Sequence, residues 1–140
     1  MPEHEHIIEV VRGWVEKAEN DLRTAVHILK MEQRCPTDTV CFHAQQCVEK
    51  YIKAVLVLDG TDFPRTHDIE QLVSFLPRGI LDTWALREQR TLTQYATTTR
   101  YPGDYEPIAM AEAKRAVKIA RRVRKDIRAA LPREALSAVR

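Results

Sequence analysis

Residues 41–58 read CFHAQQCVEKYIKAVLVL, the longest stretch of the chain with apolar residues on more than one side of a helix. Apolar residues recur along it at steps of three and four, which places them on one side of an α-helix. This stripe comprises Cys41, Ala44, Val48, Tyr51, Ile52 and Val55. Other apolar residues of the same helix lie outside the stripe: Phe42, Ala54, Leu56 and Leu58. A helix that is apolar on more than one side packs among several neighbours, so we predict a central helix that begins near Thr37 and ends at Asp59-Gly60.

The segments on either side of this helix have the same periodicity. Before it, apolar residues at helical spacing predict a helix over about residues 8–33, which Pro36 separates from the central one. After it, Thr66 is a candidate N-cap, and the acidic residues that follow favour the first turn of a short helix ending near Leu76. A fourth helix is predicted over about residues 81–96.

The last helix has the clearest pattern. Pro107 is expected in its first turn, where the missing N–H has no partner within the helix. Small and branched residues then alternate at steps of four and three: Ala109, Ala113, Ala116, Ala120, Val123, Ile127 and Ala130. These residues form a narrow small-residue seam along one side of the helix, and such a seam favours the close approach of another helix.

Four long amphipathic segments and one short one, joined by short connections, predict an all-α fold, an antiparallel up-and-down helical bundle. A chain of 140 residues with 44% hydrophobic content fits one domain, 1–140, with a core over about 8–131 and termini that fray.

Composition excludes several classes of protein. Charged residues make up 30% of the chain and interrupt every apolar run before it could span a membrane. The polar start lacks a secretory signal, so a cytoplasmic location is expected. The three cysteines are expected to be free thiols, and Cys41 and Cys47, six residues apart, do not share a helix face. We expect neither a metal site nor a cofactor, and we assign the pair His4 and His6 to a solvated tail.

The formal net charge of +2 is unevenly distributed. Residues 106–140 hold ten basic and four acidic residues, whereas residues 1–105 hold twelve and sixteen. The basic residues of the last segment are Lys114, Arg115, Lys118, Arg121, Arg122, Arg124, Lys125, Arg128, Arg133 and Arg140. Three interpretations remain open, namely a solvated helix face, contact with RNA or a nucleotide through its phosphates, and pairing with an acidic partner protein.

Polar side chains flank the apolar stripe of the central helix. His43, Gln46, Lys50 and Lys53 share one face, and Phe42, Gln45, Glu49 and Lys53 form a neighbouring stripe. On a buried helix such groups must find partners. They form either a structural hydrogen-bond network or a binding site made partly from His43, Lys50 or Lys53.

The turn before the last helix contains Arg100, Tyr101, Asp104 and Tyr105 around Pro-Gly. Arginine binds phosphate with two parallel hydrogen bonds, and tyrosines stack on bases. These four residues are therefore candidates for nucleotide or partner binding. Alternatively, Arg100 pairs with Asp104 and the tyrosines anchor the turn to the bundle.

Four segments together resemble one family. They are residues 14–22 (WVEKAENDL), 41–54 (CFHAQQCVEKYIKA), 63–69 (FPRTHDI) and 100–105 (RYPGDY). Their order and sequence are similar to those of the HEPN domain, named for higher eukaryotes and prokaryotes nucleotide-binding. The resemblance implies an all-α bundle, a homodimer, and frequent pairing with a minimal nucleotidyltransferase as a toxin–antitoxin system. Active family members are metal-independent ribonucleases.

The family's catalytic signature, an Arg followed four to six residues later by a His, is incomplete here. Arg100 matches the arginine, but Tyr105, Glu106 and Pro107 occupy the places for the histidine. The tyrosine hydroxyl titrates near pH 10, so it is a poor general acid or base for RNA cleavage at neutral pH. We therefore expect a binding protein without ribonuclease activity. The alternative is a ribonuclease in which His43 or His67 supplies the imidazole, and a third possibility is that Tyr101 or Tyr105 accepts a nucleotidyl group.

Overall fold

The computed structural model describes residues 2–97 and 107–136. These residues form helices α1 (Pro2–Leu29), α2 (Thr37–Leu58), α3 (Ile69–Ser74), α4 (Leu86–Gln94), α5 (Met110–Ala130) and α6 (Arg133–Leu136), with a 3-10 helix at Glu32–Arg34. The described ranges contain no β-strand. The prediction of an all-α fold is confirmed.

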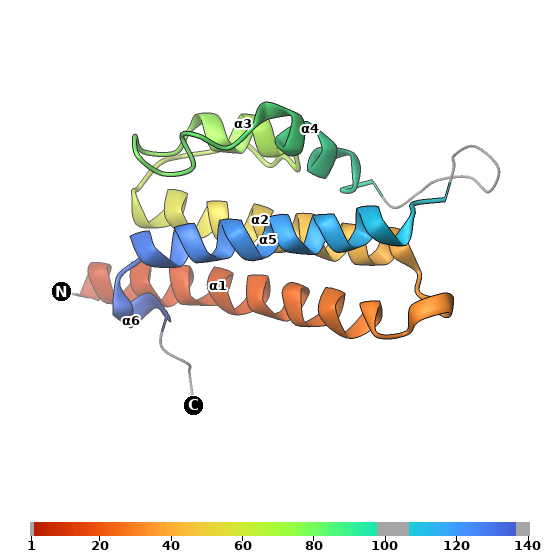
Figure 1. Cartoon of the computed structure of the whole chain (residues 1–140). Helices are drawn as coiled ribbons and strands as arrows, with labels where there is room; N and C mark the ends of the chain where they lie inside the picture. Colours follow the sequence, from red (N-terminus) through yellow and green to blue (C-terminus); the bar gives the residue numbers. More distant parts are fainter. Residues whose placement is uncertain (1, 98–106, 137–140) are drawn as a thin grey trace.

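Helix α2 occupies the centre of the bundle, as predicted. It contacts α1, α5, α3 and α4. Figure 1 shows α1 along one edge of the bundle, the short helices α3 and α4 along the opposite edge, and α2 and α5 between them. The chain runs along α1, returns along α2, runs back through α3 and α4, and returns along α5 (Figure 1). This is the predicted antiparallel up-and-down order, with two short helices together filling the third position.

The start and the end of α2 lie where the sequence predicts them. The helix begins at Thr37, directly after Pro36, and ends at Leu58. Gly60 follows with φ of +70°, a left-handed conformation that glycine adopts without steric cost.

Helix α1 begins at Pro2, earlier than its predicted start near residue 8. His4 and His6 therefore lie in the first turns of this helix, and their assignment to a tail is wrong. His4 Nε2 lies 3.3 Å from Glu134 Oε1 of α6, and Arg12 donates to Glu134 O at 2.7 Å. These contacts between α1 and α6 hold the first turns of α1 against the other end of the chain.

Other helix boundaries differ from the predictions for local reasons. Helix α1 ends at Leu29 rather than near residue 33, and Glu32 soon afterwards has φ of +53°. The N-cap of α3 is Asp68, whose side chain accepts a hydrogen bond from Gln71 N at 3.1 Å. The prediction of Thr66 as N-cap is wrong, because its hydroxyl accepts only from Asp68 N.

Helices α4 and α5 both begin later in the chain than the sequence predicts. Leu81 has φ of +59°, which lies outside the α-helical region, and Ala85 is extended with ψ of 132°, so α4 begins at Leu86. Helix α5 begins at Met110 after an extended Ala109, and Pro107 therefore lies outside it. Thr37 of α2 donates its hydroxyl hydrogen bond to Ile108 O at 2.7 Å, which holds this approach to α5 against the start of α2.

The small-residue seam of α5 faces the core over most of its length. Its buried members are Ala113, Ala116, Ala120, Val123 and Ile127. Ala109 and Ala130, at the two ends, are exposed. The seam packs mainly against α2, which supports the predicted close approach of helices.

Candidate functional site

Asp21 of α1 binds two side chains of α2. Its Oδ1 lies 2.7 Å from His43 Nδ1, and its Oδ2 lies 2.5 Å from Lys50 Nζ. Asp21 is buried, whereas His43 and Lys50 are half-buried. Because the contact uses Nδ1, the imidazole keeps Nε2 for a further partner. A carboxylate that orients a histidine in this way is also found in acid–base catalysis.

Glu49, directly before Lys50 on α2, organises a second cluster. Its Oε1 accepts hydrogen bonds from Gln45 Nε2 at 3.0 Å and from His67 Nδ1 at 2.8 Å, and its Oε2 lies 2.9 Å from Lys53 Nζ. The side chains of Glu49 and Lys53 are only 4% and 10% exposed. Burial alone would raise the pKa of Glu49, but the hydrogen bonds from Lys53, Gln45 and His67 outweigh it and hold the pKa below its ordinary value.

Two aromatic rings surround the ammonium group of Lys53. Its Nζ lies 5.6 Å from the ring centre of Trp14 and 5.9 Å from that of Phe63. Both distances are within the range of cation–π attraction. Trp14 belongs to α1 and Phe63 to the segment between α2 and α3, so this one lysine holds three parts of the chain together.

The polar face predicted on α2 is therefore divided between two carboxylates. His43 and Lys50 share Asp21, whereas Lys53 pairs with Glu49 and Gln46 donates to Gln45 Oε1 at 2.7 Å. Each carboxylate neutralises a lysine charge. With both lysine charges neutralised, this face offers a ligand mainly hydrogen bonds, which His43 and Gln46 can make.

The two candidate histidines bind different carboxylates. His67 pairs with Glu49, and its side chain is 67% exposed, whereas His43 pairs with Asp21 and its side chain is 25% exposed. The other predicted site residues, Arg100, Tyr101, Asp104 and Tyr105, lie outside the described residues. Their position relative to either imidazole stays a prediction.

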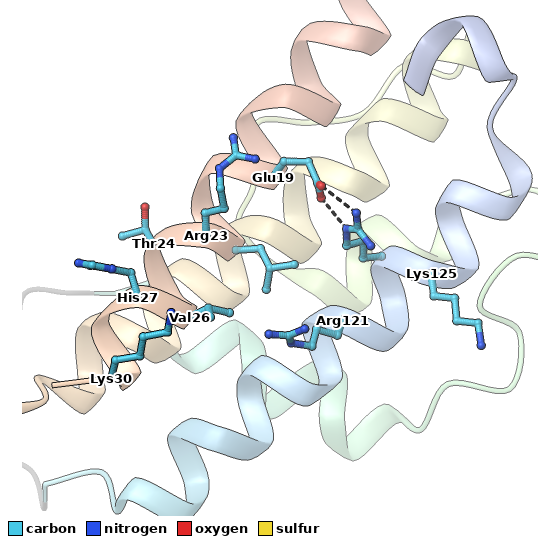
Figure 2. Close-up of a pocket in the computed structure, with 10 residues that line it drawn as sticks. Glu19, Arg23, Thr24, Val26, His27, Lys30, Arg121 and Lys125 are labelled. Carbon is cyan, nitrogen blue, oxygen red and sulfur yellow. Dashed lines mark hydrogen bonds and ion pairs between the residues drawn. The ribbon is translucent and has the colours of Figure 1, made fainter. Parts of the chain in front are cut away.

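A basic groove lies between α1 and α5 (Figure 2). It is an open groove with a volume of about 900 Å³, and Leu22 and Val26 form its apolar lining. Five basic side chains line it: Arg23, Lys30, Arg121, Arg124 and Lys125. Figure 2 shows Arg23, His27 and Lys30 on α1, and Arg121 extending from α5. Its one acidic lining residue is Glu19.

Glu19 is bound at one side of this groove by residues of α5 and α2. Arg124 donates to it through Nε at 2.7 Å and a terminal nitrogen at 2.9 Å, and Tyr51 donates its hydroxyl hydrogen bond to the same carboxylate. Burial tends to raise the pKa of Glu19, but these bonds and the charges of Arg124 and Arg128 keep it below its ordinary value. Burial and the bond to Glu19 raise the pKa of Tyr51. Glu19 and Arg124 therefore neutralise each other.

Only one wall of the groove was predictable from the sequence. Arg121 and Lys125 belong to the basic segment noted in the sequence, but Arg23, His27 and Lys30 of α1 carried no comparable signal. They share one face of α1 by steps of three and four, and only the packing of α5 against α1 places them opposite a second basic helix.

Two kinds of feature are absent from the described residues. Within residues 2–97 and 107–136, no group of three or more His, Cys, Asp or Glu side chains is placed to hold a metal ion. In the same part of the chain, no helix has the length and apolar character needed to cross a membrane.

Known proteins resemble this chain in sequence and in structure. A protein of Methanocaldococcus jannaschii named Putative toxin MJ1304 is 32% identical over an alignment of 110 residues, and the match covers 70% of this chain and 67% of that protein. The crystal structure of TT1696 from Thermus thermophilus superposes with a TM-score of 0.74 at 26% identity, covering 86% of this chain and 98% of the other. The crystal structure of ST0689, an archaeal HEPN homologue, superposes with a TM-score of 0.65 at 27% identity, covering 86% of this chain and 96% of the other. Residues 11–130 match the HEPN domain, and the chain therefore belongs to the HEPN family.

Proposed function

We propose that this protein is the HEPN component of a toxin–antitoxin type pair, a homodimer that binds RNA or a nucleotide without cleaving it. The observation that carries the proposal is the half-exposed face of α2 formed by His43, Gln46 and Lys50, on which buried Asp21 holds His43 and Lys50. The similarity to a protein named as a toxin supports the toxin–antitoxin context.

The proposed site combines this face with Arg100, Tyr101, Asp104 and Tyr105. Arg100 would bind a phosphate, the tyrosines would stack on a base, and His43 and Gln46 would hydrogen-bond to the ribose or the base. In the proposed homodimer, both subunits contribute to one cleft. A minimal nucleotidyltransferase is the proposed partner, and the reading frame beside this one tests for it directly.

Binding and cleavage are measured on the same purified protein. Fluorescence anisotropy of a labelled RNA oligonucleotide should report binding, and a denaturing gel should show the oligonucleotide intact. Arg100→Ala and His43→Gln should each weaken binding several-fold, whereas His6→Gln, a change on the exposed part of α1, should not. Cleavage that disappears in Arg100→Ala would contradict the proposal. Light scattering that gives a monomer at micromolar concentration would contradict the dimer.

The second candidate function is a metal-independent ribonuclease, and the 2.7 Å contact between Asp21 and His43 is the observation in its favour. His43 Nε2 would take the proton of a ribose 2′-hydroxyl, whose oxygen attacks the adjacent phosphorus. The 5′-oxygen would leave with a proton from water, and the product would carry a 2′,3′-cyclic phosphate. Cleavage in the presence of EDTA that is lost in Asp21→Asn and His43→Gln but kept in His67→Gln would establish this function.

A further inference from the structure

The groove between α1 and α5 carries positive charge that the protein itself leaves largely uncompensated. Arg124 is neutralised by Glu19, and Arg23 donates to the neutral Asn20 side chain at 2.5 Å. For Lys30, Arg121 and Lys125, the described part of the chain provides no hydrogen bond or ion pair, and all three are exposed. Four positive charges, on Arg23, Lys30, Arg121 and Lys125, therefore face one groove.

The arrangement differs from an ordinary solvated helix face. The charges stand on two separate helices, α1 and α5, that form opposite walls of a hollow of about 900 Å³. Leu22 and Val26 give the hollow an apolar lining between the charged walls. Two charged walls with an apolar surface between them suit a ligand that carries a line of negative charge and also has apolar faces. A single nucleic-acid strand, with its phosphates and bases, has this character.

We propose that this groove is a binding track for the backbone of single-stranded RNA, separate from the α2 site of the proposed function. Arg121 and Lys125 lie one helical turn apart on α5 and contact successive parts of the backbone, while Arg23 and Lys30 contact it from α1. Leu22 and Val26 pack against sugars or bases. The inference rests on the proposed function, because it names a second place where the same ligand binds.

The two sites lie on opposite sides of α1. At 100° per residue, Asp21 is about 160° around the helix from Arg23 and about 180° from Lys30. Asp21 contacts α2, whereas the groove opens toward α5. Substitutions in the groove therefore leave the Asp21–His43–Lys50 contacts in place, and the two sites can be tested separately.

The salt dependence of RNA binding reports how many phosphates the cations of the groove neutralise. For single strands, the slope of log K against log salt is about −0.7 per phosphate contact, so four cations give about −2.8. With a labelled oligouridylate of about 12 nucleotides, these contacts lower the affinity about 50-fold between about 50 and 200 mM salt. The variant Arg121→Gln/Lys125→Gln should lose half of this dependence, a slope change of about 1.4, and Arg23→Gln/Lys30→Gln should lose the same amount from the other wall.

The control variant is Arg87→Gln/Arg115→Gln. It removes the same charge but from the cavity between α4 and α5. It should leave the slope near the wild-type value. Far-UV circular dichroism and the unfolding midpoint verify that each variant is folded, and all groove substitutions are at exposed positions where folding should survive.

The outcomes separate this inference from the proposed function. If the wild-type protein binds RNA but both groove variants keep the wild-type slope, the inference is wrong and the proposed function stands. An equal fall in the control variant also overturns it, since the effect is then one of net charge. Equal competition by polyglutamate, or equal binding of duplex RNA, overturns the choice of ligand. If the wild-type protein binds no RNA at low salt, the inference fails, and RNA binding is removed from the proposed function, which then requires a nucleotide.

Discussion

The ion pair between Glu49 and Lys53 gives the sharpest test of how this bundle is held together. Its side chains are only 4% and 10% exposed. Lys53→Met removes the charge but keeps the length of the side chain, and leaves the Glu49 carboxylate buried without its cation. Removing one partner of a buried pair costs about 3–5 kcal/mol. Because Gln45 and His67 still donate to Glu49, we expect the lower end, about 3 kcal/mol.

For a chain of this length, such a loss lowers the unfolding midpoint by roughly 6–12 °C, at about 2–4 °C per kcal/mol. Urea unfolding followed by circular dichroism, at one fixed protein concentration, measures the free energy directly. The double variant Glu49→Leu/Lys53→Met should recover much of the loss, because replacing a whole buried pair by apolar residues is often neutral.

The matched control is Glu70→Gln, which breaks the ion pair of Glu70 with Arg90 at 2.9 Å on the exposed surface. Solvent and salt screen this pair, so the unfolding midpoint should barely move. If Lys53→Met proved as stable as the wild-type protein, or if the double variant were no more stable than the single one, Glu49 would not depend on Lys53 and this reasoning would be refuted.

Two further predictions concern titrating groups. In the folded protein the pKa values of Glu49 and Glu19 are below the ordinary 4.5, so their contribution to stability is fully present above that pH and is lost as the pH falls through the folded values. Urea unfolding should show that the free energy of unfolding falls as the pH is lowered from about 5 to 3, and that it falls less steeply in Glu49→Gln than in the wild-type protein. Equal pH dependence in the two proteins would contradict this prediction. Burial, followed by the charge of Glu112, raises the pKa of Cys41 to about 12, and Cys47 is also buried, so a thiol reagent at neutral pH should label only Cys35 before unfolding. Mass spectrometry counts the labels, and more than one on the native protein would argue against this packing.

Much of the fold was predictable because local signals agree with the packing. Helix α2 begins and ends where Pro36 and Asp59-Gly60 indicate, and its several apolar sides correctly indicated a central position. The spacing of small residues likewise predicted the buried seam of α5. Where α4 and α5 begin was not predictable, because each helix starts after an extended alanine, Ala85 or Ala109, that no local signal marks. The approach to α5 is also held by the hydrogen bond from Thr37 to Ile108 O, which joins residues far apart in the sequence.

Of the candidate site, the sequence indicated the residue types on α2 but not how they are paired. Asp21 lies 22 residues from His43, so no periodicity connects them. The four residues predicted in the turn at 100–105 stay predictions, because they lie outside the described part of the chain.

Spacing and composition along the chain are enough to predict which segments are helical, the central place of α2 and the excess of basic residues near the C-terminus. Only the tertiary structure decided which charges are neutralised and which are available to a ligand. Glu19 and Arg124 stand 105 residues apart and compensate each other, while Lys30 and Arg121, in the same groove, remain uncompensated within the described residues. The physical reason is that electrostatic pairing depends on distance in space, which the packing of α1 against α5 sets.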